Sequence, residues 1–308
     1  MGLIGLGKMG GYHLNLYDEI PEIKLTALCD ADEGALGLQV IKKNVPGFTN
    51  YRNILPLVDA VTIAAPTKLH YEITRACLEA GKHIFVEKPI TTDYRQAAEL
   101  FELAEKKHLT IQIGYVERFN GVTRELKNIV SNPTLIEARR VGPFNPNFKN
   151  DSIIMDIMIH DIDIALSVSG RQVAAIQAMG APVHTKLADY ASVNIYFGNS
   201  SMAHIVAGRI NHVKERFINI TQDDTLIMLD YLKQNIDIIR KGQLQDFSER
   251  DEIKYKNNPL KNEIEHFVSC VEGKSARIVS IEHDLHTMEV ALEVDSLLKS
   301  NTYGYKEF

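Results

Sequence analysis

The chain has 308 residues, of which 45% are hydrophobic and 24% are charged, and its formal net charge is −6. The composition is that of a globular protein, and the length favours two domains. The negative charge argues against a protein that binds nucleic acid or an anionic membrane, and no stretch approaches the roughly 18 uninterrupted apolar residues of a membrane span. Three cysteines without a CxxC pair, and an N-terminus without a signal-peptide pattern, predict a cytoplasmic protein with free thiols.

The first third of the chain alternates short apolar runs with helical stretches. The clearest helix is Asp93–Lys107, which begins with an acidic residue, ends with basic residues and carries apolar residues at i, i+3 and i+4 spacing. Strand–helix alternation with nearly continuous apolar strands predicts an α/β domain with a doubly wound parallel sheet. The strand-like runs are Leu3–Leu6, Lys24–Asp30, Ala60–Ala64, His83–Val86 and Thr110–Gly114.

The character of the sequence changes after about residue 115. Thr134–Val141 is strand-like, and Tyr190–Ile210 contains two alternating runs around a Gly-Asn-Ser turn, which is typical of an antiparallel hairpin. Lys214–Leu229 gives further strand-like runs, and two amphipathic helices, Asn262–Glu272 and Glu282–Lys299, end the chain. We therefore predict a second, α+β domain, with the domain boundary between residues 117 and 118.

A glycine-rich motif joins the first predicted strand to the first helix. Gly5, Gly7 and Gly10 form GxGxxG, in which the first glycine makes a tight turn, the second lets the backbone approach a pyrophosphate and the third permits close helix–strand packing. The helix N-terminus offers N–H groups to the phosphates, although glycines also mark ordinary strand–helix turns. Asp30, at the end of the second strand, is placed to accept hydrogen bonds from ribose hydroxyls. No arginine follows it to neutralise a 2′-phosphate, so NAD is favoured over NADP.

Two further motifs follow predicted parallel strands at their C-terminal ends, where ligands bind in open α/β sheets. They are AAPTKLH, over Ala64–His70, and EKP, over Glu87–Pro89. Lys88 stands where the chain leaves its strand, and in isolation it would also suit an ordinary surface lysine.

The apolar segment Met155–Leu166 carries one histidine and three aspartates. On a regular helix Asp156, His160 and Asp163 share one narrow stripe and Asp161 points well away from it. Because the remaining residues predict burial, the stripe requires partners. A histidine satisfied by local aspartates, a metal site completed by a ligand from elsewhere, and an acid/base site are all compatible with this pattern.

The motifs GLGKMG, AAPTKLH, EKP and D-x-x-x-H, in this order, resemble the Gfo/Idh/MocA oxidoreductase family over essentially the whole chain. The resemblance implies an NAD-binding Rossmann domain over 1–117. It also implies a substrate-binding α+β domain over 118–308 with a large open-faced, mostly antiparallel sheet, and a site between the two. Lys88 is then expected to polarise the reacting hydroxyl, His160 to transfer its proton, and Asp156 to bind substrate and support the histidine. The implied cofactor-binding residues are Gly5, Gly7, Lys8, Met9, Gly10, Asp30, Ala65, Pro66, His70, Glu87 and Lys88.

A narrower resemblance concerns the branch of this family that acts on the 3-hydroxyl of UDP-N-acetylglucosamine, and it is carried by GYVERFN, RRVGPF and TLIMLDY. Arg118, Arg139 and Arg140 suit bidentate contact with a diphosphate. Alternatively, Arg118 pairs with Glu117 or Asp163, and at least one of Arg139 and Arg140 faces solvent, since strand neighbours point in opposite directions. The substrate-binding residues expected from the resemblance are Tyr115, Arg118, Asn120, Asp156 and His160.

These observations predict an NAD-dependent dehydrogenase that oxidises a secondary hydroxyl of a sugar or nucleotide sugar, UDP-N-acetylglucosamine at C3 being the leading candidate. The alternatives are a dehydrogenase of a free sugar or inositol, a redox-silent NAD-binding regulatory protein, and a metalloenzyme built on Asp156, His160 and Asp163. The leading interpretation requires no metal. An open-faced sheet with one uncovered side also predicts a homodimer or homotetramer.

Overall fold

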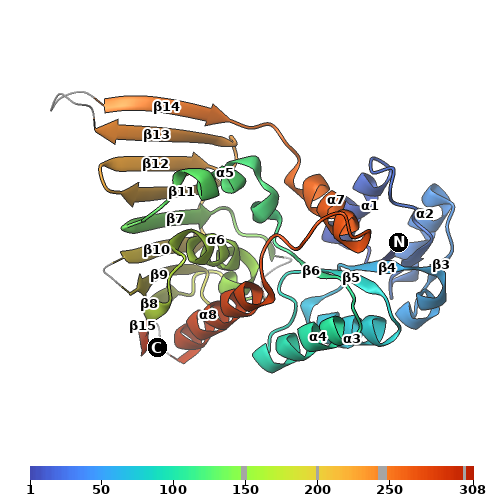
Figure 1. The fold of residues 1–308 in the computed structure, drawn as a ribbon. Coiled ribbons are helices and arrows are strands. Elements are labelled where there is room, and N and C mark those ends of the chain that lie inside the picture. The colour runs from blue at the N-terminus through green and yellow to red at the C-terminus, as the bar shows by residue number, and fades with distance from the viewer. Residues whose placement is uncertain (147–150, 199–200, 242–247, 301–302) are drawn as a thin grey trace. The chain divides into compact units, whose positions relative to one another are not determined.

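The computed structural model describes residues 1–146, 151–198, 201–241, 248–300 and 303–308 (Figure 1). The predicted Gly-Asn-Ser turn therefore lies partly outside the described residues. The chain divides into two compact units, one made of Met1–Val116 and Leu260–Leu285 and the other of Glu117–Pro259 and His286–Phe308. This division differs from a single boundary at residue 117, because a late segment of the chain belongs to the first unit.

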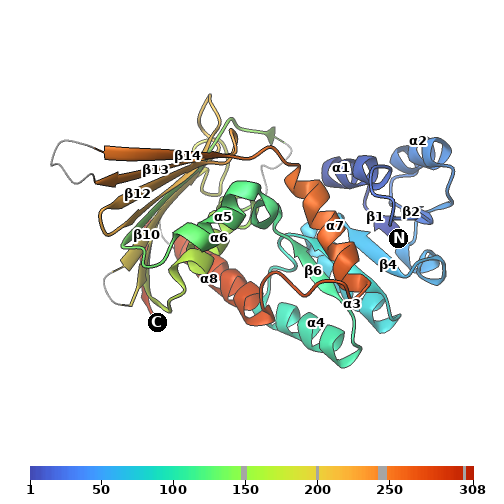
Figure 2. The same cartoon turned by 45° about the horizontal axis from the view of Figure 1, so that its top comes forward.

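The first unit contains a six-stranded, fully parallel sheet in the order β3-β2-β1-β4-β5-β6. Figures 1 and 2 show α1 and α2 on one face of this sheet and α3 and α4 on the other. The predicted doubly wound fold is confirmed, with the short edge strand β3 in addition to the five predicted strands. The strands are β1 (Gly2–Ile4), β2 (Ala27–Cys29), β3 (Gly47–Phe48), β4 (Ala60–Ile63), β5 (His83–Glu87) and β6 (Ile111–Gly114), and the helices are α1 (Lys8–Tyr17), α2 (Glu33–Lys43), α3 (His70–Glu79) and α4 (Tyr94–Lys106).

Helix α4 shows how the local sequence produces these elements. Asp93 caps the helix by accepting the N–H of Gln96 at 3.0 Å, and Lys106 lies in the last turn. Its buried residues follow i, i+3, i+4 and i+7 spacing, which places one apolar stripe against the sheet. These buried residues are Ala97, Leu100, Phe101 and Ala104.

Helix α7 (Pro259–Val271) completes the core of the first unit although it follows the second unit in the chain. Phe267 is fully buried and its ring meets that of Phe85 edge-on, with the ring centroids 5.7 Å apart. The Gln112 side chain of β6 also donates to the Glu263 carbonyl oxygen at 3.0 Å. The sequence predicts this helix, but its apolar face does not reveal which sheet it covers.

The second unit is built on a nine-stranded sheet in the order β14-β13-β12-β11-β7-β10-β9-β8-β15. All neighbouring strands are antiparallel except β7 and β10, so the predicted mostly antiparallel sheet is confirmed. The strands are β7 (Leu135–Val141), β8 (Val173–Ala181), β9 (Tyr190–Phe197), β10 (Ser201–Gly208), β11 (Glu215–Gln222), β12 (Thr225–Asp230), β13 (Asn235–Lys241), β14 (Ser248–Lys254) and β15 (Tyr303–Glu307).

Helices cover one face of this sheet. Figures 1 and 2 show α5 (Gly121–Ile129), α6 (Ile159–Ser169) and α8 (Ile281–Ser300) on the same side of the strands. Strand β7 alternates accordingly, with Ile136, Ala138 and Arg140 buried and Glu137 exposed between them. No helix of the described chain covers the opposite face. Within the same residues, no helix combines the length and the apolarity that a membrane crossing requires.

Candidate active site

The glycine-rich loop of the first unit packs more closely than any side chain would allow. Gly5 has a φ of +93°, and a Cβ added there would lie 2.6 Å from the Ala64 backbone. A Cβ on Gly10 would lie 1.9 Å from the Gly5 carbonyl oxygen, whereas a Cβ on Gly7 would meet no atom within 4 Å. Helix α1 starts after Gly7 with no side-chain cap and no acidic residue in its first turn. This geometry fits the pyrophosphate of a dinucleotide, since the helix N–H groups and the space beside Gly7 face no competing side chain.

Asp30 lies just beyond β2, where its carboxylate is fixed by the backbone. One carboxylate oxygen accepts the N–H of Leu6 at 2.6 Å, and the other accepts the N–H of Asp32 at 2.9 Å. Each carboxylate oxygen can accept more than one hydrogen bond. Asp30 is therefore held in place and can still accept hydrogen bonds from the ribose hydroxyls of a cofactor.

The segment after β4 carries three further predicted cofactor residues, Ala65, Pro66 and His70. Ala65 is partly buried and Pro66 is exposed, as are Lys8 and Met9 in the first turn of α1. His70 differs from them because it is buried, with Nδ1 2.8 Å from the Pro89 carbonyl oxygen and Nε2 2.7 Å from that of Ala65.

Burial lowers the pKa of His70, and the two carbonyl acceptors oppose that shift. A neutral imidazole donates only one hydrogen bond at a time. The His70 ring lies between the loop after β4 and the loop after β5, and its neutral form donates a hydrogen bond to one of the two at a time.

Glu87 and Lys88 leave the sheet at the end of β5. Glu87 is buried, and its Oε1 lies 2.7 Å from Nε2 of His13, which is fully buried on α1. Lys88 is partly buried, and the Lys88–Pro89 peptide is cis. The glutamate of the EKP motif is thus anchored inside the unit, while the next residue lies nearer the surface.

In the second unit the segment that carries Asp156 and His160 is not a regular helix. Ile154–Met158 forms a π-helical turn, and α6 begins at Ile159. A π turn closes i→i+5 hydrogen bonds, so it changes the angular offset between Asp156 and the residues after it. The predicted single polar stripe is therefore wrong in detail. Asp156 and His160 are partly buried, whereas Asp161 and Asp163 are fully buried.

Those two buried aspartates bind two buried arginines in two groups, Arg118 with Asp163, and Arg140 with Asp161 and Glu117. We call these five residues together the buried charge network. Arg118 donates to Asp163 through Nε at 2.8 Å and Nη2 at 2.6 Å. Arg140 donates twice to Asp161 at 2.8 Å, and its Nη1 donates to Glu117 at 2.7 Å. Although burial lowers it, the two carboxylates raise the pKa of Arg140 well above its ordinary value. The alternative expectation, that Arg118 pairs with Asp163, is confirmed.

Other residues predicted to contact substrate are also engaged within the protein. Arg139 lies on the opposite face of β7 from Arg140 and donates to Glu215 at 2.5 Å. Tyr115 and Asn120 are almost fully buried, and the Asn120 amide lies 3.3 Å from Oε2 of Glu117. The structure thus accounts for all three arginines of the sequence motifs through acidic side chains of the same unit.

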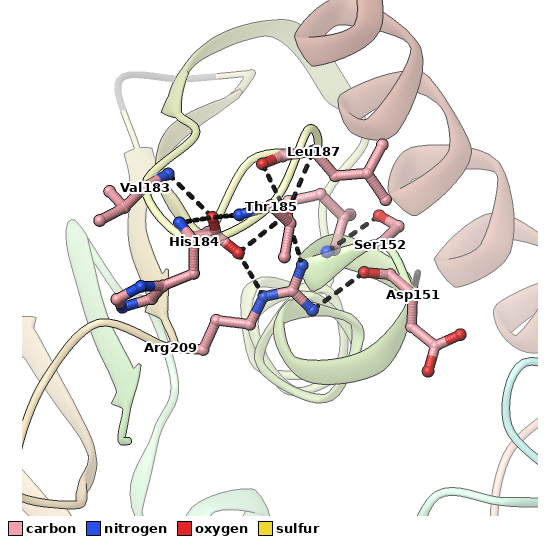
Figure 3. A network of polar contacts seen from close by, with 9 residues as sticks. Asp151, Ser152, Val183, His184, Thr185, Leu187 and Arg209 are labelled. Atoms are coloured by element: carbon pink, nitrogen blue, oxygen red, sulfur yellow. Dashed lines mark hydrogen bonds and ion pairs between the residues drawn. The ribbon is translucent and has the colours of Figure 1, made fainter. Parts of the chain in front are cut away.

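A second polar network fixes the start of the helical segment (Figure 3). Asp189 is fully buried and accepts the backbone N–H groups of residues 183–185 at 2.6–2.8 Å. Its other oxygen accepts a hydrogen bond from Nε of Arg209 at 2.7 Å. Nη1 of Arg209 donates to the Asp151 carbonyl oxygen at 3.1 Å (Figure 3). Burial alone would raise the pKa of Asp189, but these donors hold it well below its usual range. The ionised Asp189 thus orders the loop before β9 and positions Arg209, which in turn binds the backbone of Asp151 just before the helical segment.

The metal hypothesis finds little support in this geometry. Asp163 accepts Arg118 with both of its oxygens, which leaves a poor ligand for a cation. Among the described residues, no three or more His, Cys, Asp or Glu side chains lie together so that they could hold a metal ion.

Two family models match the chain. One is the oxidoreductase family with an NAD-binding Rossmann fold, over residues 1–115, and the other is the GFO/IDH/MocA C-terminal domain, over residues 132–226. The chain belongs to the Gfo/Idh/MocA family. This assignment confirms the predicted NAD-binding oxidoreductase and its Rossmann domain.

Within the family, the chain is similar to UDP-N-acetylglucosamine 3-dehydrogenase of Acidithiobacillus ferrooxidans, with 29% identity over 78% of this chain and 77% of that protein. A solved structure of that dehydrogenase superimposes with a TM-score of 0.91 at 26% identity and covers 98% of each chain. The chain is also similar to myo-inositol 2-dehydrogenase of Thermotoga maritima, with 30% identity over 59% of this chain and 58% of that protein.

Sequence reasoning overlooked several charged residues of this Gfo/Idh/MocA protein. The partners of Asp189 and Glu87 were not predicted, because Arg209 and His13 are remote from them in the chain. Arg216 was also overlooked, although it occupies the inward phase of an alternating strand together with Ile218 and Ile220. A charged residue in that phase is a signal that could have been used.

Proposed function

We propose that this protein is an NAD-dependent dehydrogenase acting on a CH–OH group of a nucleotide sugar. The proposed substrate is a UDP-N-acetylhexosamine, UDP-N-acetylglucosamine above all, oxidised at C3 to the 3-keto sugar. The likeness to UDP-N-acetylglucosamine 3-dehydrogenase carries this proposal, because it extends over 98% of both chains in the structural comparison. The motifs GYVERFN and RRVGPF support the same choice.

The proposed roles follow from the chemistry of alcohol oxidation, in which an O–H and a C–H bond break and a C=O bond forms. Bound NAD would accept the hydride. His160, as a neutral imidazole, would accept the hydroxyl proton. Asp156 would orient the imidazole ring of His160 and bind substrate. The Lys88 ammonium would stabilise the negative charge that develops on the oxygen.

NAD rather than NADP is proposed as the cofactor because Asp30 stands where a 2′-phosphate would lie. Repulsion and loss of ribose hydrogen bonds should weaken NADP binding by a few kcal/mol. The glycines, Asp30, and the loop carrying Ala65 and Pro66 would contact the cofactor directly. The buried His70 would act by holding that loop beside the loop after β5.

The direct test is NADH formation with purified protein and a panel of UDP-sugars, free sugars and inositols at equal concentrations. A nucleotide diphosphate contributes binding energy remote from the reacting hydroxyl, so UDP-N-acetylglucosamine should react far faster than N-acetylglucosamine. If myo-inositol or glucose reacts much faster than every UDP-sugar, the proposed substrate is wrong.

The second candidate is a dehydrogenase of a free inositol or sugar, favoured by the 30% identity to myo-inositol 2-dehydrogenase. The same panel separates it from the first. A redox-silent binding protein is the third candidate, and it would bind NADH yet reduce NAD with no member of the panel.

We also propose a cytoplasmic enzyme that self-associates through the uncovered face of the second sheet. The described cysteines are unpaired, as a reducing compartment requires, and Met179 and Met228 are exposed on the sheet. Light scattering on the purified protein would report the oligomeric state, and a monomer at high concentration would contradict this part of the proposal.

A further inference from the structure

The residue that carries this inference is Arg216 on β11. In the register of the antiparallel pair β7–β11, Arg216 lies opposite Arg140, and Ile218 lies opposite Ala138. Directly opposed residues of an antiparallel pair project to the same face. Because Arg140 contacts Asp161 of α6, Arg216 projects to the face of the sheet that α6 covers.

Arg216 differs from its neighbour Arg140 in the hydrogen bonds that its guanidinium makes. Arg140 donates three hydrogen bonds to Asp161 and Glu117. Within the described residues, the guanidinium of Arg216 makes no hydrogen bond or ion pair, although the residue is partly buried. A partly desolvated cation without a direct acceptor is costly unless something else supplies one. The nearest acids of the buried charge network are already bound to Arg140.

The electrostatic surroundings of Arg216 are those of a cation without a directly bound acid among the described residues. Burial and the neighbouring Arg140 lower its pKa, while Glu117, Asp161 and Asp156 oppose that shift. Asp156 is the proposed substrate-binding aspartate, so Arg216 lies in the same part of the second unit as the proposed chemistry.

A second donor lies beside Arg216. The backbone N–H of Tyr231 donates to the Arg216 carbonyl oxygen at 3.0 Å, so the two residues adjoin across the strand pair. Tyr231 is only 4% exposed, and its hydroxyl has no hydrogen-bond partner among the described residues. Burial raises its pKa well above the ordinary value, which keeps the phenol a neutral donor. Two unmet donors on adjoining residues favour an oxygen-rich anion as their ligand.

We propose that Arg216, with the hydroxyl of Tyr231, binds a phosphate of the nucleoside diphosphate carried by the substrate. This inference rests on the proposed function, and it assigns the diphosphate contact to a residue outside the VERF and RRVGPF motifs. Guanidinium is suited to phosphate because its planar fork donates two parallel hydrogen bonds. The diphosphate is attached to the sugar ring that is oxidised, so its binding site must lie near Asp156.

The test is calorimetric titration of the full-length protein with UDP, in the presence and absence of NADH. Loss of a charge-assisted phosphate contact should weaken UDP binding roughly tenfold to a hundredfold in Arg216→Gln. Arg216→Lys keeps the charge but not the planar fork, so its UDP affinity should lie between those of the wild type and Arg216→Gln. Tyr231→Phe should weaken UDP binding by a few-fold. The matched control is Arg139→Gln on the opposite face, which should bind UDP like the wild type. NADH affinity should be unchanged in all four.

Steady-state kinetics add a readout that a purely structural role would not move. The KM for the UDP-sugar should rise in Arg216→Gln while the rate with an uncharged free sugar stays the same. Wild-type UDP affinity in a folded Arg216→Gln overturns the inference. Failure of both Arg216→Gln and Arg216→Lys to fold also overturns it, since the arginine would then be a structural charge.

The outcomes also separate this inference from the proposed function. If UDP binds through Arg216 but no UDP-sugar reduces NAD, the binding site stands and the proposed reaction falls. If UDP-sugars react but the variants bind UDP normally, the reaction stands and the assignment to Arg216 falls. If the wild-type protein does not bind UDP at all, both are wrong.

Discussion

The two units of this protein use polar groups in contrasting ways. In the first unit the surface offered to the cofactor consists of glycines, backbone N–H groups and Asp30, and the contacts that shape it are made by backbone atoms. In the second unit Arg118 and Arg140 are buried against acids 21–45 positions away. A motif that works through backbone geometry can therefore be interpreted locally, whereas a charged motif can be interpreted only once its partners are known.

The largest effect is expected when the proposed catalytic side chain of each unit is removed. Lys88→Ala in the first unit and His160→Ala in the second should each reduce turnover by roughly 10²–10⁴, the usual cost of a lost positioned acid, base or charge. NADH affinity and the melting temperature should be close to those of the wild type. The exposed Lys106→Ala serves as control. Near-native turnover in either variant would refute the role assigned to that residue.

The buried charge network should contribute more to stability than the partly exposed pair of Arg139 and Glu215. Arg118→Ala removes the positive charge beside the buried Asp163 and should cost about 3–5 kcal/mol of the free energy of unfolding. Arg139→Ala breaks a partly exposed pair with Glu215 and should cost under about 1 kcal/mol. Urea denaturation measures both. Equal losses would show that the buried and the partly exposed arginine of the second unit are not used differently.

The glycine loop allows a finer separation of packing from ligand access. Gly10→Ala places a methyl group against the Gly5 carbonyl oxygen and should destabilise the fold by about 1–3 kcal/mol. Gly7→Ala meets open space, so the free energy of unfolding should change by less than about 0.5 kcal/mol. Its NADH affinity should nevertheless fall several-fold, since the methyl group occupies the space beside the proposed pyrophosphate. Unchanged NADH affinity in Gly7→Ala would argue against that placement.

The smallest expected effect is a pH dependence that originates at His70. Because burial lowers its pKa in the folded protein, the unfolded chain binds the proton first as the pH falls below about 6.5. The contribution of neutral His70 to stability is thus fully present above that pH and is lost below it. The free energy of unfolding should fall between about pH 7 and pH 5, and fall less steeply in His70→Gln. An identical slope in His70→Gln would contradict the assignment.

The sequence was sufficient to predict all strands of the first sheet except β3, which has only two residues. It also predicted the helix capped by Asp93, because strand runs, caps and glycine turns depend on neighbours in the chain. The π turn at Ile154–Met158 was not predictable, since a regular helix fits the same pattern of apolar residues.

The arginines illustrate the limit of such reasoning for the candidate site. Residue type alone made Arg118 and Arg140 candidates for contact with phosphate, yet both are satisfied by Asp163, Asp161 and Glu117. Arg216 belongs to no recognised motif, and only the strand register places it beside Arg140. Which arginine can still bind a phosphate therefore depends on the pairing of the strands in the folded sheet.

The late return of the chain to the first unit has a consequence for synthesis on the ribosome. The nucleotide-binding sheet emerges first, but Phe267, which packs against Phe85, is translated only after the whole nine-stranded sheet except β15. The Phe85 side chain therefore lacks its contact with Phe267 during most of translation. A nascent chain stalled near residue 117 would present an apolar surface to chaperones, and the first unit can close its core only when translation is nearly complete.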